Sequence, residues 1–169
     1  MNTTDRNLIP ISWWIGGSVV LGLIALIVWL AFYGNETTVS LKSNREVALT
    51  CTTDMATKFH IHSNVEIIIK GEKQTIPVGI GVKPNCMNSL HTHDSLGKLH
   101  VESPEKRDFT LADFFAVWGK PYSKDQILDS QVDDRYVIRE TVNGEEVQDY
   151  ENTVLKDGDQ IIISYEEKK

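Results

Sequence analysis

The residues best suited to chemistry in this 169-residue chain are its histidines, because all five lie between residues 60 and 100. His60 and His62 form one His-x-His pair, His91 and His93 form a second, and His100 follows closely. On a strand, residues i and i+2 share a face and lie about 6.6 Å apart. Their rings can converge on one ion at metal–nitrogen distances of about 2.0–2.1 Å. The pattern therefore predicts a metal site.

Carboxylates accompany the histidines. Asp94 directly follows the second pair, and Glu102 shares a strand face with His100. We expect Asp94 to act as a ligand or as an acceptor that fixes a histidine tautomer. Imidazole-rich sites suit copper and zinc, and copper(II) binds the more tightly at equal availability.

We expect His91, His93 and His100 to form the core of this site, because a loop and a short strand bring them close. His60 and His62 join only if their strand packs beside that loop. Taken alone, His60 and His62 would be interpreted as an ordinary exposed strand face. Clustering of all five is what favours the metal hypothesis over this simpler one.

Catalytic motifs are scarce. The sequence has no G-x-S-x-G, P-loop, H-E-x-x-H or dinucleotide fingerprint. A hydrolytic zinc site with Glu102 as general base is chemically conceivable, but nothing in the sequence singles it out. We therefore assign no catalytic residue.

The two cysteines allow two interpretations. In an oxidising compartment Cys51 and Cys86 would pair and hold the start of the histidine loop. Alternatively, Cys86 would be a copper thiolate with His91 and His93, and Met87 would be a soft axial ligand. Because the second reading leaves Cys51 unpaired, we favour the disulfide.

The N-terminal part predicts a membrane anchor. The chain carries no charged residue from Asn7 to Asn35, and aromatic residues flank an apolar run long enough to span a bilayer as a helix. A cleaved signal peptide fits less well, since the apolar run is too long and no A-x-A site follows. We expect an anchor over residues 1–33 that contacts lipid through 9–33, a connector over 34–48 and a folded domain over 49–169.

Orientation follows from weaker signals. Arg6 and the terminal amine favour a cytoplasmic N-terminus. The Asn35-Glu36-Thr37 sequon and the two cysteines favour an extracytoplasmic domain. The formal charge of −7 belongs to the part after the anchor, since Asp5 and Arg6 cancel. Such an acidic domain argues against nucleic acid as a partner.

Hydrophobic periodicity predicts an α+β domain. Apolar residues alternate over 59–70, and a returning strand over 76–82 would complete a long hairpin, with Pro77 at an edge or bulge. A helix opens at Thr110 and ends at Gly119. A short helix is expected from Ser123 to Leu128. The remaining residues predict a hairpin at Asn143-Gly144 and a last buried strand over 160–165, giving a mixed sheet.

The order of elements and one sequence motif each resemble a known protein family. The order of elements, with the hairpin segment 142–147 and the turn and strand 155–161, resembles the β-grasp (ubiquitin-like) fold. The chain departs from β-grasp sulfur carriers because it ends in Glu166-Glu167-Lys168-Lys169 and not in Gly-Gly. The motif HTHD (91–94), GxxHVESP (97–104) and FTLxxFFxxWG (109–119) resembles a family of membrane-anchored prokaryotic proteins that brings no established activity with it.

Three functions are compatible with these features. The first is a membrane-anchored, extracytoplasmic module that binds copper or zinc, for example for a neighbouring membrane protein. The second is a non-catalytic interaction or structural subunit of a membrane complex. The third and least favoured is a small metal-dependent enzyme.

Overall fold

The computed structural model describes Ile27 and residues 42–168, and it places the compact unit from Lys42 onward. The expected anchor, Ile27 apart, and the connector up to residue 41 lie outside the described residues. Within the described part, no helix has both the length and the apolar character needed to cross a membrane. The compact unit is mixed α+β, mostly sheet with few helices, as the sequence predicts.

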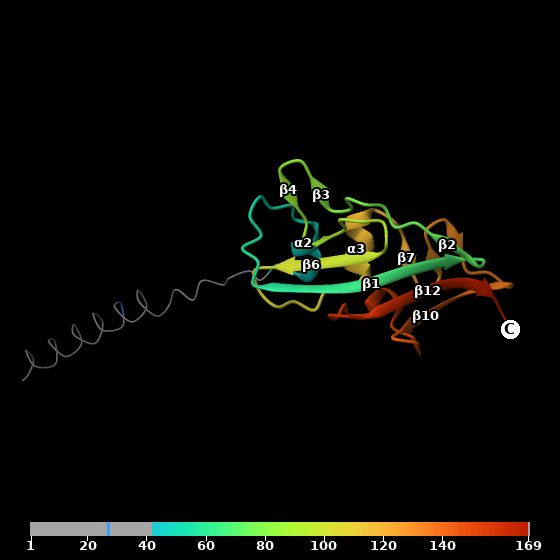
Figure 1. Ribbon diagram of the computed structural model, residues 1–169. Helices are drawn as coiled ribbons and strands as arrows, with labels where there is room; N and C mark the ends of the chain where they lie inside the picture. Colours follow the sequence, from blue (N-terminus) through green and yellow to red (C-terminus); the bar gives the residue numbers. More distant parts are fainter. Residues whose placement is uncertain (1–26, 28–41, 169) are drawn as a thin grey trace, which may run out of the picture. The chain divides into compact units, whose positions relative to one another are not determined.

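The main sheet is mixed, and its longest strand, β1, lies inside it (Figure 1). β1 pairs in parallel with the C-terminal strand β12 and antiparallel with β6. Across the sheet the order is β11-β10-β12-β1-β6-β5, and β2 pairs with the end of β1. The strands are β1 (Phe59–Ile69), β2 (Glu72–Gln74), β5 (Leu90–His91), β6 (Lys98–Ser103), β10 (Tyr136–Val142), β11 (Glu145–Val147) and β12 (Gln160–Glu167).

Smaller elements surround this sheet. Within residues 42–168, two ribbons stand apart from it, together with two α-helices and one 3-10 helix. The helices are α2 (Asn44–Leu49), α3 (Leu111–Trp118) and η1 (Tyr150–Asn152). The ribbons consist of β3 (Val82–Lys83) with β4 (Cys86–Met87), and of β7 (Tyr122–Ser123), β8 (Gln126–Ile127) and β9 (Ser130–Gln131).

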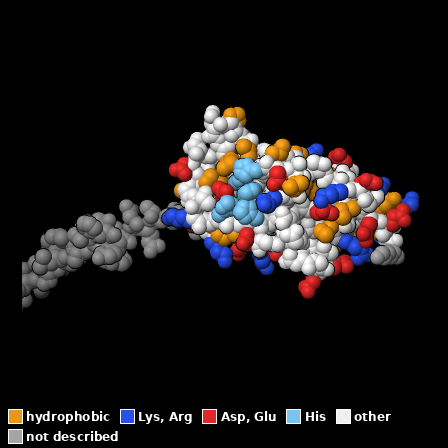
Figure 2. Space-filling view, in the orientation of Figure 1, with side chains coloured by type: hydrophobic (Ala, Val, Ile, Leu, Met, Phe, Trp, Pro, Cys, Tyr) orange, Lys and Arg blue, Asp and Glu red, His pale blue; other side chains and the backbone are white. Residues whose placement is uncertain are grey.

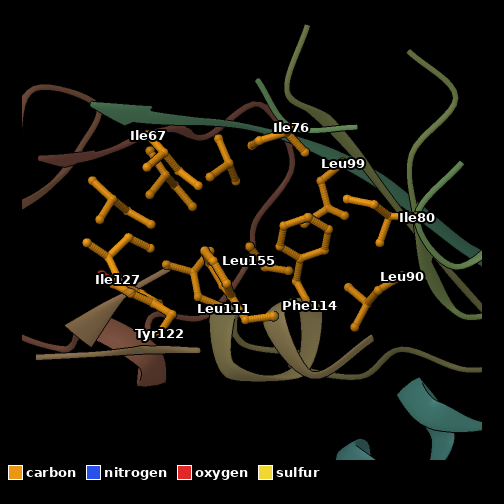
Figure 3. Close-up of a cluster of buried hydrophobic side chains, with 14 of the residues drawn as sticks. Ile67, Ile76, Ile80, Leu90, Leu99, Leu111, Phe114, Tyr122, Ile127 and Leu155 are labelled. Carbon is orange, nitrogen blue, oxygen red and sulfur yellow. The ribbon is translucent and has the colours of Figure 1, made fainter. Parts of the chain in front are cut away.

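Alternation along β1 divides its residues between a core face and an outer face, as expected. Val65 and Ile67 are buried, whereas His60 is exposed and His62 half-buried on the opposite face. The core lies between the sheet and α3: Ile67 and Leu99 extend from the side of the sheet and Phe114 from the helix, with Phe114 close to Leu99 (Figure 3). Burying such side chains contributes about 1.5–3 kcal/mol each.

Helix α3 has the ends that its sequence predicts. The Asp113 carboxylate accepts a hydrogen bond from the backbone N–H of Thr110 at 3.1 Å, which satisfies a free donor at the helix start. Gly119 ends the helix with φ of 72°, a left-handed conformation that glycine adopts without steric cost. The aromatic residues of the helix belong to the core, as their spacing indicates.

Two expectations about local structure are wrong. The return from β1 is only Glu72–Gln74, so the long hairpin through Val82 does not form. Pro77 has no N–H to donate, and Gly79 and Gly81 have φ of 81° and 71°, so the segment leaves the extended conformation. The short helix expected after Ser123 is instead the ribbon β7–β8–β9, because local polar residues there favour tight turns.

The expected C-terminal hairpin and last strand are confirmed. Asn143 and Gly144 form the turn between β10 and β11 with φ of 55° and 87°. Such positive values suit Asn-Gly in a two-residue hairpin. β12 is the last strand and pairs with both β1 and β10.

The disulfide is also confirmed. Cys51 and Cys86 are bonded, so the copper-thiolate alternative for Cys86 is wrong. A backbone bridge between Thr52 and Met87 continues the same connection. The segment after α2 is therefore fastened to β4, which opens the histidine loop.

Replacing both cysteines with alanine should lower the free energy of unfolding by about 4 kcal/mol, because the unfolded chain regains loop entropy. Urea unfolding of the two proteins measures the difference. The wild type treated with a reductant serves as the matched control and should lose a similar amount. Equal stability with and without the bond would contradict this account of the loop.

Candidate metal centre

The register of three neighbouring strands brings the histidines together. In the β1–β6 pair, His62 lies opposite His100 and His60 lies opposite Glu102. In the β5–β6 pair, His91 lies opposite His100. Directly opposite residues on one face have Cβ atoms about 4.5–5.5 Å apart. The three histidines His62, His100 and His91 therefore form a row across β1, β6 and β5.

The cluster lies on the face of these strands opposite the hydrophobic core. Leu99 and Val101 of β6 are buried in the core, and His100 and Glu102, which alternate with them, lie on the other side. Figure 2 shows the histidine side chains as one continuous patch on the molecular surface. The structure thus unites all five predicted histidines, including the pair that required β1 to pack beside the loop.

Two groups of three histidines could each hold a metal ion. His60, His62 and His100 form the first group, and His91, His93 and His100 form the second. Within each group the candidate ligand nitrogens all lie within 4.8 Å of one another. Nitrogens bound to one tetrahedral ion lie roughly 3.4 Å apart, so small side-chain adjustments would complete either site.

In the first group the nitrogens already approach each other closely. His62 Nε2 lies 3.1 Å from His100 Nδ1, and His60 Nε2 lies 3.5 Å from the same atom. Neutral imidazole has one N–H and one lone pair. Hydrogen bonds among the rings can therefore use only some of the nitrogens that meet here. A metal ion would accept lone pairs from all three rings.

His91 is the most constrained member of the cluster. Its side chain is fully buried, and its Nδ1 lies 3.0 Å from the carbonyl oxygen of Asn88. A carbonyl only accepts, so Nδ1 carries the proton and Nε2 presents a lone pair. That Nε2 is buried without any hydrogen-bond partner among the described residues. Buried polar atoms nearly always have a hydrogen-bond partner, so an unpaired Nε2 in this position indicates a ligand-binding site.

His93 completes the second group from the exposed side. Its ring centroid lies 4.8 Å from that of His91 and 4.8 Å from that of His100. The rings of His91 and His100 are nearly parallel, with centroids 5.3 Å apart. An ion in this group would therefore contact one buried ring, one half-buried ring and one solvent-accessible ring.

Glu102 lies among the histidines, whereas Asp94 does not. Glu102 Oε1 is 3.3 Å from His60 Nε2 and 4.0 Å from His91 Nε2, so its charge faces one member of each group. The carboxylate of Asp94 accepts a hydrogen bond from the N–H of Leu96 at 2.8 Å and belongs to neither group. Asp94 is a turn residue here, a common role for aspartate.

Sequence reasoning missed two residues that position His91. The Asn88 carbonyl fixes its tautomer, as partners of metal-binding histidines usually do. Gly81 lies so close to β5 that an added Cβ would sit 2.3 Å from the Leu90 carbonyl oxygen and 3.2 Å from the His91 Cβ. No motif marks either residue, although Asn88 stands three positions before His91.

Gly81→Ala should displace β5 and disturb His91. Gly79→Ala is its matched control, because Gly79 also has positive φ but open space around its Cβ position. Both variants should lose about 1–2 kcal/mol from left-handed strain. Gly81→Ala should lose about 1–3 kcal/mol more from the clash, as measured by urea unfolding. Equal losses in the two variants would contradict the close approach to β5.

The electrostatics of the cluster keep its central ring neutral. Burial, followed by the neighbouring rings of His62, His91, His93 and His60, lowers the pKa of His100 to about 4. Burial also lowers the pKa of His91, against the opposing effects of the Asn88 carbonyl and Glu102. Metal ligands must be deprotonated, so both rings are ready to bind near neutral pH.

This shift makes the stability of the metal-free protein depend on pH. Between the ordinary histidine value of 6.5 and about 4, the unfolded chain binds a proton at residue 100 that the folded chain excludes. The free energy of unfolding should therefore fall as the pH falls through this window, and stay high above it. His100→Gln should reduce that slope in unfolding experiments at several pH values. An NMR titration of His100 with an ordinary midpoint would contradict the prediction.

Comparisons of the chain with protein-family models, with curated proteins and with solved structures found no match.

Proposed function

We propose that this chain is a membrane-anchored, extracytoplasmic module that binds copper or zinc through its histidine cluster. The observation that carries the proposal is His91 Nε2, a buried lone pair without a hydrogen-bond partner among the described residues and beside the rings of His93 and His100. A buried group of this kind costs about 1–3 kcal/mol unless a ligand satisfies it. A site whose function is to bind a ligand would retain such an unsatisfied nitrogen.

Further features of the cluster support a metal over another ligand. Its donors are imidazole nitrogens, with the Glu102 carboxylate beside them, and imidazole-rich sites suit copper(II) and zinc. Glu102 supplies negative charge beside the cluster, and the net charge of −7 favours cations generally. The disulfide holds the start of the histidine loop, which reduces the entropy lost on binding.

The location is proposed from the sequence and the disulfide. The apolar run over residues 9–33 supports a single membrane anchor, and a bonded Cys51–Cys86 pair suits an oxidising compartment outside the cytoplasm.

We also propose that the domain is of the β-grasp type. The parallel pairing of β1 with β12 and the position of α3 between β6 and β10 in the chain support this assignment.

Metal binding is tested on the full chain, purified in mild detergent without a histidine tag. The protein should bind copper(II) or zinc stoichiometrically. At free ion concentrations of about 100 times Kd, its free energy of unfolding should rise by about 2.7 kcal/mol. Replacing His91 and His93 together with alanine should weaken binding by at least about 100-fold, since even indirect partners of a metal commonly contribute 10–100-fold. Isothermal calorimetry measures both proteins.

Asp94→Asn is the matched control, because asparagine can keep the turn and Asp94 belongs to neither histidine group. Its metal affinity should equal that of the wild type. Absence of stoichiometric metal in the wild type would overturn the metal proposal and favour the alternative of a non-catalytic interaction subunit. A metal affinity that is unchanged when His91 and His93 are replaced would also overturn the metal proposal.

A further inference from the structure

The two histidine groups share one residue. His100 belongs to both, whereas His60 and His62 occur only in the first group and His91 and His93 only in the second. The sharing follows from the sheet, because β6 lies between β1 and β5 and His100 is opposite a histidine on each side. A central ring with a histidine pair on either flank is a different arrangement from five ligands around one point.

Among the described residues, the nitrogens of all five histidines do not converge as one group. Ligand nitrogens on one ion, each about 2.0–2.1 Å from it, are separated by at most about 4.2 Å. In this structure the five histidines fall into two overlapping sets of three, each with its own convergence of nitrogens. A single ion would leave one His-x-His pair without a role.

The chemistry of His100 allows it to serve both sets. Its Nδ1 faces His62 Nε2 and His60 Nε2 at 3.1 and 3.5 Å. An imidazole ring has a second nitrogen, Nε2, that can bind another ion at the same time. When both nitrogens bind metal the ring is an imidazolate, and its remaining N–H proton passes to solvent.

Glu102 adds a second, independent indication. Its Oε1 lies near His60 Nε2 of the first group and His91 Nε2 of the second, at 3.3 and 4.0 Å. Two divalent ions close together repel each other strongly unless negative charge lies near both. A carboxylate that faces both groups and an imidazolate between them would supply that charge.

We propose that the cluster is a two-ion centre in which His100 bridges the ions as an imidazolate. His60, His62 and His100 Nδ1 bind one divalent ion, and His91, His93 and His100 Nε2 bind the other. The ions lie about 6 Å apart, from two metal–nitrogen bonds of about 2 Å and the width of the ring. Glu102 lies beside both ions and balances part of their charge. This inference rests on the proposed metal-binding function and specifies the number of ions and their coupling.

Copper(II) provides the test, because two copper(II) ions bridged by imidazolate couple antiferromagnetically and lose EPR intensity. The full chain is titrated with copper(II), and bound copper is measured by elemental analysis beside the integrated EPR signal. Two coppers per chain should bind, and the signal per copper should fall as the second ion enters. The loss should not depend on protein concentration, which excludes coupling between chains.

Two double variants locate the ions. Replacing His60 and His62 with alanine should leave one copper with a full, uncoupled EPR signal on the second group. Replacing His91 and His93 should leave one uncoupled copper on the first group. His60 is exposed and His62 half-buried, so the first variant should fold even if loss of the buried His91 disturbs the second. Circular dichroism monitors folding in both.

Each outcome distinguishes this inference from the proposed function. One tightly bound copper with a full signal in the wild type would overturn the two-ion centre and leave the metal-binding function intact. Two coppers with uncoupled signals would overturn the bridge. No stoichiometric copper, and no zinc in a parallel titration, would overturn both.

Discussion

The antiparallel register of β1 with β6 is the constraint on which the candidate site depends. It places His62 opposite His100 and His60 opposite Glu102, and β5 extends the same row to His91. Because side chains alternate between faces, a slip of one residue would turn His100 into the core. The hydrophobic core fixes the register: Leu99 and Val101 on β6 are buried, and Ile61, which lies opposite Val101 on β1, packs against the same core. Core packing therefore positions the polar site on the opposite face.

The β5 side of the site is held by contacts other than strand pairing. β5 has only two residues, so strand pairing alone holds it weakly. The Cys51–Cys86 bond fastens the preceding loop, the Asn88 side chain donates to the Ala48 carbonyl at 2.8 Å, and Gly81 lies directly against Leu90. These covalent and polar contacts keep His91 buried with a fixed tautomer. A rigid ligand loses little entropy when an ion binds.

Several local features were predictable from the sequence, whereas the pairing of β1 with β6 was not. Periodicity along 59–69, the ends of α3 and the Asn143-Gly144 turn depend on neighbouring residues, and each is confirmed. The pairing of β1 with β6 crosses an irregular segment of about 30 residues, where Pro77 and two left-handed glycines end the expected return strand. Histidine composition therefore indicated the site, but only the sheet showed that His60 and His62 join His100. Asn88 acts through its backbone carbonyl, which no side-chain pattern can reveal.

The central claim is that His91 Nε2 is a metal ligand, and nitrogen NMR of the histidine rings tests it most directly. The ¹⁵N shifts of both His91 ring nitrogens are measured in the full chain before and after zinc is added. Nδ1 should stay protonated throughout, and the Nε2 signal should shift strongly when zinc binds. A His91 Nε2 signal that stays unchanged while zinc binds elsewhere would contradict it.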